Sequence, residues 1–296
     1  MTEQTVNRPQ ALWLGAMPGL FVFLWSTGFI GAKLGLPYAE PLTFLGLRFV
    51  IVAVFLLVVT LVARAPWPRS WREAGHVAVA GLLLHGVYLG GVFASIHQGV
   101  PAGVSALIVG IQPLLTAVVV GPLLGERVTP LQWLGLTLGL FGVALVVWNK
   151  LGLGDGTPFG MALAVFALLG ITAGTLYQKK YCGATDLRSG NVIQFAAAAA
   201  AMLLLAPLFE TMRIEWSGRF VFALAWLVLV MSVGAITLLY ILIRRGAAAR
   251  VASLFYMVPP STALIAWFLF GETLDATALA GMALAVIGVA LINLRR

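Results

Sequence analysis

Charge is scarce in this chain. Charged residues make up 9% of its 296 residues, apolar residues make up 61%, and the mean hydropathy is +1.03. A water-soluble domain carries about 25% charged residues. The shortage excludes a soluble globule, because too little polar surface is present to cover one. A single cysteine, Cys182, also excludes an internal disulfide.

Long apolar runs are abundant instead. About 20 helical residues cross a bilayer core of about 30 Å. The runs are continuous rather than alternating, which predicts helices and not barrel strands. The sequence therefore predicts an all-α integral membrane protein. The ten expected spans are 12–34, 42–63, 75–95, 103–124, 131–149, 159–178, 190–209, 220–243, 250–270 and 276–294.

The net charge of +8 does not indicate nucleic-acid binding, because the basic residues lie in short connections between apolar runs. Thirteen Lys and Arg are expected on the side that holds both termini, and four on the other side. Arg48, inside a span, accounts for the last of the 18. The positive-inside rule then predicts that both termini are cytoplasmic.

The second half of the chain repeats the first. Residues 102–146 align with 248–292 at a shift of 146, and fourteen of the forty-five pairs are identical. Five spans per half place the second copy upside down, which is a common plan of secondary transporters. We therefore predict two five-helix inverted-topology repeats, at residues 1–149 and 150–296. The informative matches are Pro113 with Pro259, Gly125-Glu126 with Gly271-Glu272, and Gly-Val-Ala-Leu at 142–145 with the same residues at 288–291.

Prolines interrupt two matched spans. Pro113 is expected near the middle of span 103–124, and Pro259 and Pro260 near the middle of span 250–270. A proline inside a helix frees carbonyl groups, which in a membrane need partners from protein, water or ligand. Ordinary kinking is one interpretation. A polar site between the repeats is the other, and the matched positions favour it.

Arg48 is the one charged residue expected well inside a span. A charge in hydrocarbon costs about 2.5–3.5 kcal/mol on insertion scales and marks a functional site by default. The guanidinium group either snorkels to the membrane surface or holds a carboxylate through a two-pronged hydrogen bond. The matched position in the second repeat, Gln194, is also polar.

His85 is expected near the centre of the third span, with Tyr88 on the same helix face. A lone histidine of this kind is either a hydrogen-bonded structural group or a substrate contact. The spans hold no interior Asp or Glu, so carboxylate-based proton coupling is not expected. His85 is then the only group at depth that titrates near neutral pH.

No cofactor is expected, and no residue cluster has metal-ligand spacing. The remaining candidates for substrate contact are Trp25, Ser26, Gln112, Thr172, Tyr240 and Tyr256.

These features resemble the drug/metabolite transporter superfamily, and in particular its EamA-type exporters. The resemblance rests on the two repeats, on the Pro-x(11)-Gly-Glu spacing in both halves, and on the Gly-Val-Ala-Leu ends. The Trp-Ser-Thr-Gly-Phe opening at 25–29 looks most like bacterial amino-acid exporters of the YddG kind. The resemblance implies a bacterial inner-membrane exporter of small metabolites. It also implies a cavity lined by helices one to four and six to nine, with helices five and ten at the periphery.

The expected function is export of amino acids, aromatic or broad neutral ones, by alternating access. No Walker A motif is present, so ATP is not the expected drive. Export of drugs or lipophilic cations is the first alternative. A membrane-embedded lipid-modifying enzyme is a distant one, because it would need an Asp, Glu or His constellation that the sequence lacks. The expected partners are the small-molecule substrate and the bilayer, and the oligomeric state stays open.

Overall fold

The structure of the protein is a computed structural model, which describes residues 8–100, 102–148, 157–270 and 275–294. The predicted repeat boundary at 149/150 and the Gly271-Glu272 pair lie outside these residues. Across the described ranges the chain is helical and holds no strand, and eight of its helices are long and apolar enough to cross a membrane.

The helices form ten consecutive segments, several of them interrupted. This arrangement confirms the predicted fold class. In chain order the segments are α1 (Arg8–Gly35), α2 (Pro41–Val62), α3 with α4 (Trp71–Gly81, Tyr88–His97), α5 with α6 (Ala102–Val109, Gln112–Leu124), α7 (Pro130–Val147), α8 (Pro158–Tyr181), α9 (Leu187–Phe209), α10 with α11 (Gly218–Trp226, Ile236–Arg245), α12 with α13 (Ala248–Ser253, Val258–Phe270) and α14 (Ala276–Asn293).

Side chains before the first turns fix where several helices begin. Thr129 and Gln132 form a reciprocal capping box at the start of α7, and Pro130 occupies its first position. The hydroxyls of Ser70 and Ser217 accept backbone N–H bonds at the starts of α3 and α10. Such caps satisfy amide groups that have no partner within the helix. They also carry the third and eighth segments several residues beyond the predicted spans 75–95 and 220–243.

Two π-helical turns lie at matched positions in the two repeats. Leu82–Val87 joins α3 to α4, and Leu227–Ala235 joins α10 to α11. At the shift of 146, the first turn falls within the second. The proline spans are also interrupted at matched points, by a break at 110–111 and by a 3-10 turn over Leu254–Met257. π turns are frequent at functional sites, so these interruptions direct attention to this part of the bundle.

The inversion of the repeats is visible where equivalent helices meet. α7 and α14 pack backbone against backbone: a Cβ on Gly135 would lie 2.6 Å from the carbonyl oxygen of Gly288, and one on Gly142 would lie 2.6 Å from that of Gly281. Gly135 is equivalent to Gly281, and Gly142 to Gly288. The two contacts are therefore exchanged by the repeat, and the helices run in opposite directions.

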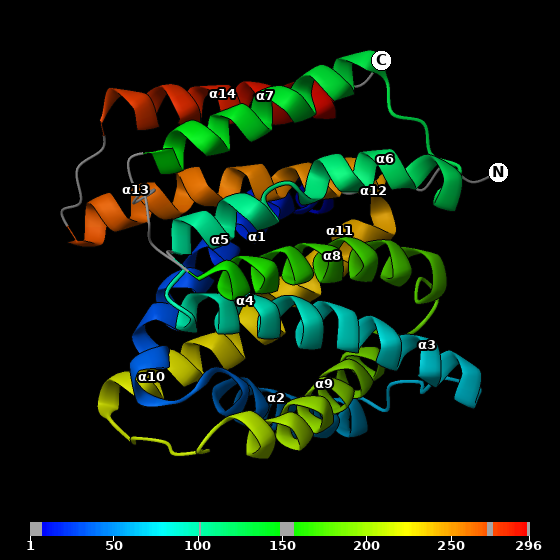
Figure 1. The fold of residues 1–296 in the computed structure, drawn as a ribbon. Helices are drawn as coiled ribbons and strands as arrows, with labels where there is room; N and C mark the ends of the chain where they lie inside the picture. Colours follow the sequence, from blue (N-terminus) through cyan, green and yellow to red (C-terminus); the bar gives the residue numbers. More distant parts are fainter. Residues whose placement is uncertain (1–7, 101, 149–156, 271–274, 295–296) are drawn as a thin grey trace.

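α2 and α9 form a second antiparallel pair of equivalent helices. The carboxylate of Glu210, just after α9, accepts bonds from the backbone N–H groups of Leu42 and Thr43 at the start of α2 (2.6 and 2.7 Å). At the other end, the Ser189 hydroxyl donates to the Pro66 carbonyl (2.7 Å). In Figure 1 the α7 and α14 pair lies along one edge of the bundle, and the α2 and α9 pair lies along the opposite edge.

The two ends of the bundle differ in charge. One end holds the first residue of α1 and the last of α14, on the right of Figure 1, and we call it the basic end. The opposite end, where α2 begins and α9 ends, we call the far end. Large apolar side chains are exposed on the sides between them, including Leu204 at 74% and Phe141 at 64%. Exposed apolar sides between two polar ends suit a protein that sits in a bilayer. The basic end carries Arg64, Arg69, Arg72, Arg127, Lys179, Lys180, Arg188, Arg244, Arg245 and Arg250.

Candidate functional site

A chain of buried polar side chains runs between four segments near the middle of the bundle. The Tyr240 hydroxyl (α11) donates to Gln194 Oε1 (α9) and lies 3.2 Å from His85 Nε2. Gln194 Nε2 in turn donates to Gln178 Oε1 (α8) over 2.9 Å. All four side chains are at most 4% exposed. The repeat thus brings together His85, Gln194 and Tyr240, which the sequence predicted separately.

The hydrogen-bond directions assign the protonation of His85. Tyr240 has one hydroxyl proton and uses it toward Gln194, so it accepts from His85. The neutral tautomer of His85 that fits this arrangement has its proton on Nε2. Its Nδ1 atom is buried and has no protein partner. The ring stacks on Phe195 with centroids 4.2 Å apart. A bare acceptor held in a fixed ring can receive a hydrogen bond from a ligand or water.

Arg48 lies on α2 beside this chain and is 4% exposed. Its Nε donates to the Ser232 hydroxyl over 3.1 Å, in the π-helical turn of the second repeat. No carboxylate in the described part of the chain pairs with it. A buried cation without a carboxylate is costly unless another group supplies the negative charge. The described residues therefore leave the positive charge of Arg48 uncompensated.

Arg48 faces a small cavity that we call the arginine cavity. Its volume is about 40 Å³, whereas cavities that hold small-molecule ligands measure roughly 300–1,000 Å³. The arginine cavity is thus too small in this structure to hold an amino acid. The lining residues are Trp25, Gly28, Ala32, Arg48, Tyr88, Leu89, Val92, Phe93, Ile96, Leu227, Met231 and Ile236.

Aromatic rings form the wall beside the cavity. Trp25 makes edge contacts with Phe255, with centroids 5.2 Å apart, and a tilted contact with Phe21 at 5.2 Å. Toward the far end, Phe44 packs against Phe93 and Phe220 at 6.0 and 5.3 Å. Two of them cross between the repeats: Trp25 with Phe255 joins the first repeat to the 3-10 turn, and Phe44 with Phe220 joins it to α10. Separation of the halves would have to break them.

Other predicted site residues lie away from the arginine cavity. Ser26 donates to the Val22 carbonyl of its own helix, 2.7 Å away, and lies 3.3 Å from the Val258 carbonyl next to Pro259 and Pro260. Thr172 donates only to Leu168 within α8. Gln112, which begins α6 together with Pro113, donates to Thr116 over 3.4 Å, and its Oε1 is unpartnered.

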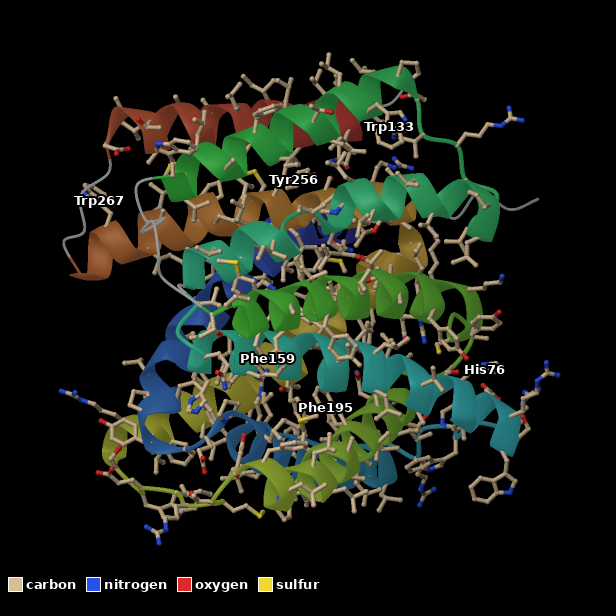
Figure 2. The ribbon with its side chains drawn as sticks, viewed as in Figure 1. His76, Trp133, Phe159, Phe195, Tyr256 and Trp267 are labelled. Carbon is tan, nitrogen blue, oxygen red and sulfur yellow. The ribbon has the colours of Figure 1, made fainter. Side chains whose placement is uncertain are left out.

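Tyr256 belongs to a different part of the molecule. It is fully buried in an apolar cluster with Leu136 and Val143 of α7 and Ile292 of α14. Figure 2 shows Tyr256 near α7, on the other side of the central helices from Phe195, the ring that stacks on His85. Its hydroxyl has no partner. Tyr256 is thus placed between the halves at their edge, beside the peripheral helices.

Two residues of this centre were not among the sequence candidates. Ser232 holds Arg48, and Gln178 ends the polar chain. Gln178 lies at the end of the predicted sixth span, so the criterion of depth within a span did not select it. Ser232 is a small residue in an apolar helix, equivalent to Gly86. Only its place in a π-helical turn distinguishes it, and sequence patterns do not show such turns.

The two ends of the bundle are tied by carboxylates. At the basic end Glu126 binds Lys179 with one oxygen and accepts the backbone N–H of Ala248 with the other (2.9 Å), while Lys179 also donates to the Gly246 carbonyl (2.6 Å). At the far end Glu40 accepts from the hydroxyl and backbone N–H of Thr211, both at 2.7 Å. The hydrogen bond from the Thr211 hydroxyl lowers the pKa of Glu40. Each tie joins the two repeats.

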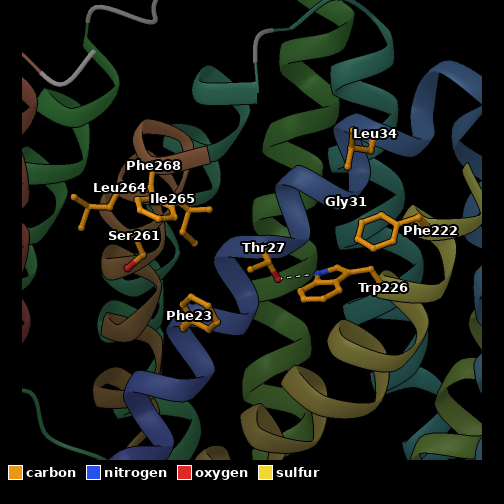
Figure 3. A pocket seen from close by; sticks show the side chains of 10 residues that line it. All are labelled: Phe23, Thr27, Gly31, Leu34, Phe222, Trp226, Ser261, Leu264, Ile265 and Phe268. Atoms are coloured by element: carbon orange, nitrogen blue, oxygen red, sulfur yellow. Dashed lines mark hydrogen bonds between the residues drawn. The ribbon is translucent and has the colours of Figure 1, made fainter. Parts of the chain in front are cut away.

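An apolar groove of about 670 Å³ lies on the side of the bundle toward the far end. Figure 3 shows its walls: Phe23 and Thr27 on α1, Trp226 on α10, and Ser261 and Phe268 on α13. The Trp226 indole N–H donates to the Thr27 hydroxyl over 3.0 Å. Phe268 is 80% exposed, so the groove opens sideways toward lipid. It is separate from the arginine cavity, and we call it the far groove.

Two inverted membrane-helical halves that enclose a buried polar centre define a membrane protein with the architecture of a secondary transporter. Comparison with known families agrees. The model of the EamA-like transporter family matches residues 15–148 and again 158–294. The chain therefore belongs to the EamA-like transporter family, as the sequence predicted, and is a membrane transporter of this type.

Relatives are similar along most of the chain. The inner membrane transporter YedA of Escherichia coli K12 is 28% identical over 280 residues, covering 95% of this chain and 90% of that protein. A probable amino-acid metabolite efflux pump of Salmonella typhimurium LT2 is 26% identical over 285 residues, covering 93% and 92%.

A probable terminal-alkyne amino-acid exporter of Streptantibioticus cattleyicolor is 27% identical over 286 residues, covering 93% of this chain and 92% of that protein. A solved crystal structure superposes with a TM-score of 0.77 at 20% identity, covering 94% of this chain and 96% of that one. At this identity the structural match shows the fold alone.

Proposed function

We propose that the protein exports amino acids from the bacterial cytoplasm across the inner membrane, with aromatic or other neutral amino acids as cargo. The observation that carries the proposal is Arg48: a buried guanidinium without a carboxylate partner that faces the arginine cavity. Every amino acid supplies such a carboxylate, and a guanidinium binds it with two parallel hydrogen bonds. The relatives named as amino-acid exporters support the same cargo class.

The walls of the arginine cavity favour an apolar or aromatic side chain on the substrate. Trp25 and Tyr88 lie beside Arg48, and most other lining residues are aliphatic. Rings of this kind bind an apolar side chain by contact and exclude water from it. In the proposed cycle the cavity widens toward the polar chain, and the unpartnered His85 Nδ1 accepts a hydrogen bond from the α-amino group.

Transport then follows from alternate opening of the two ends. Opening the basic end requires the Glu126 tie to break, and opening the far end requires the Glu40 and Glu210 contacts to break. The positive-inside rule places the basic end, and with it both termini, in the cytoplasm. The halves rock about the arginine cavity, which both sides reach in turn.

The experiment is efflux from proteoliposomes. Purified protein is reconstituted and loaded in turn with labelled phenylalanine, tryptophan, leucine, alanine and lysine, and separately with a labelled lipophilic cation, each with and without a pH gradient. We expect protein-dependent release of the aromatic and aliphatic amino acids. Release of a lipophilic cation without release of any amino acid would overturn the proposal in favour of drug export.

Arg48 is tested in the same assay. Arg48→Gln keeps a polar side chain but loses the cation, so we expect the apparent affinity for amino acids to fall at least tenfold, since charged hydrogen bonds contribute about 1.5–3 kcal/mol. Arg48→Lys keeps the charge and loses the fork, and an intermediate value is expected. Arg72→Gln, an exposed arginine of α3, is the matched control. An unchanged affinity in Arg48→Gln would refute the carboxylate role.

A further inference from the structure

A second groove lies on the side of the bundle at the basic end. It measures about 820 Å³, within the size range of sites that hold small molecules. α1, α11, the 3-10 turn and α14 form its walls, and we call it the basic groove. Its lining residues are Pro18, Gly19, Val22, Phe23, Leu242, Arg245, Gly246, Arg250, Val251, Leu254, Met257, Ser261, Val286, Val289, Ala290 and Asn293.

The basic groove continues into the far groove. Phe23 and Ser261 line both, and Figure 3 shows these two side chains on facing helices, α1 and α13. An apolar channel therefore follows α1 along the side of the bundle. At Gly19 the channel is open: a Cβ added there would meet no atom within 4 Å. Its shape is that of a long apolar chain lying parallel to the helices.

Charge distinguishes the two grooves. The far groove has no charged lining residue, whereas the basic groove carries Arg245 and Arg250 at the basic end. Neither arginine pairs with a carboxylate among the residues that the structure describes, and no Asp or Glu lines the groove. Asn293, at the end of α14, adds a polar side chain at the same mouth.

We propose that the basic groove is a binding site for a phospholipid with an anionic headgroup. The headgroup phosphate binds Arg245 and Arg250, and an acyl chain lies along Val22, Met257 and Val289 toward Phe23. Basic pockets between membrane helices recognise anionic headgroups, and each arginine near such a surface contributes about 1 kcal/mol. A free anion would fill only the mouth, and a zwitterionic lipid would leave the positive charge uncompensated.

The test measures bound lipid on the purified full-length chain. The protein in a non-ionic detergent receives phosphatidylglycerol or phosphatidylcholine, and native mass spectrometry and the midpoint of thermal unfolding report binding. We expect phosphatidylglycerol to remain bound and to raise the midpoint more than phosphatidylcholine does. Arg245→Gln with Arg250→Gln should weaken phosphatidylglycerol binding by roughly thirtyfold, because each arginine contributes about fivefold.

Two further variants separate the site from general charge. Arg69→Gln with Arg72→Gln removes the same charge from exposed positions of the basic end outside the groove, and it should bind phosphatidylglycerol like the wild type. Gly19→Leu keeps both groove arginines but fills the channel, and should weaken binding of the lipid. Equal losses in the two double variants would overturn the proposal. So would displacement of the lipid by inorganic phosphate, which would indicate an anion site without an acyl chain.

Discussion

Tyr240 holds the buried polar chain together, because its hydroxyl is the link between His85 and Gln194. Tyr240→Phe keeps the ring and removes the link, leaving the His85 N–H and the Gln194 oxygen without this partner. An unpartnered buried polar group costs about 1–3 kcal/mol. We therefore expect a lower midpoint of thermal unfolding in detergent and slower amino-acid release.

The control for Tyr240→Phe is Thr172→Val. Both remove one buried hydroxyl. The Thr172 hydroxyl, however, donates only to a carbonyl of its own helix, and that carbonyl keeps its backbone hydrogen bond within the helix after the substitution. We expect this variant to unfold near the wild-type temperature. If the two substitutions lowered the midpoint equally, the polar chain would contribute nothing beyond a generic buried hydroxyl.

The pH dependence of alkylation at Cys182, at the basic end of α8, tests whether its thiol is buried. Burial raises the pKa of its thiol to about 11, and the reactive species is the thiolate. In the folded protein the alkylation rate with iodoacetamide should keep rising, by close to tenfold per pH unit, from pH 7.5 to pH 10. In protein unfolded in dodecyl sulfate the rate should level off near the ordinary thiol pKa of about 8.5. A folded-state profile that levels off at the same pH would contradict the assigned environment.

Single residues also show how far sequence reasoning reaches. Arg48, Trp25 and Tyr88 were predicted from depth and chemistry, and the structure places all three on one cavity. Tyr256 was selected by the same criteria, yet it lies against α7 and α14. Depth along a span follows from counting residues. The direction in which a side chain points depends on how the helix is rotated and on which neighbour it meets, and a chain apolar on nearly every face carries little information on either.

At the scale of helices, the α7 and α14 pair depends on glycine. A Cβ on Gly142 would lie 2.5 Å from the Ala285 backbone nitrogen and 2.6 Å from the Gly281 oxygen. Backbone atoms cannot yield as a flexible side chain can, so the helices would have to separate. We expect Gly142→Ala to destabilise the protein by about 1–3 kcal/mol, measured as a lower midpoint of thermal unfolding.

Gly75→Ala provides the matched comparison for Gly142→Ala. Gly75 also lies in a helix, α3, but a Cβ there meets nothing within 4 Å. Alanine favours the helix by about 1 kcal/mol over glycine, so this variant should be neutral or slightly stabilising. A stabilising effect at Gly142 as well would show that the two helices are not held at backbone distance.

At the scale of helices, the sequence predicts some features of the fold and misses others. The ten segments follow from runs of apolar residues, and the antiparallel pairs follow from the shift of 146. The π-helical turns at Leu82–Val87 and Leu227–Ala235 were not predicted. Such a turn inserts one residue into the helical ladder, and the apolar pattern of the sequence does not reveal it. It rotates everything beyond it, which changes the faces on which Tyr88 and Tyr240 lie.

At the scale of the whole molecule, the structure leaves no room for cargo in the arginine cavity. A centre of about 40 Å³ cannot hold an amino acid, and both ends are tied between the repeats. The inverted repeat relates the two open states by a pseudo-two-fold rotation, so they are alike in construction. Their relative stability then depends on contacts that differ between the ends. At the basic end that contact is Glu126 with Lys179, and at the far end it includes Glu210 on the start of α2.

Breaking the basic-end tie should therefore move the whole molecule toward opening at that end. Glu126→Gln keeps the shape of the side chain and removes its charge, so Lys179 loses its ion pair, which is only partly exposed at 20% and 23% of the two side chains. Partly exposed pairs contribute up to about 1 kcal/mol. Cys182 lies just past α8, and its thiol donates to the His76 carbonyl and packs on Val77 and Ala80 of α3, so separation of α8 from α3 of the first repeat exposes it. We expect Glu126→Gln and Lys179→Met each to raise the iodoacetamide labelling rate of Cys182 about two- to fivefold at fixed pH.

Lys180→Met is the control. It removes the neighbouring exposed lysine, which forms no ion pair with a described carboxylate, and it should leave the labelling rate unchanged. If all three variants labelled at the wild-type rate, the Glu126 contact would be a surface ion pair with no part in closing the basic end.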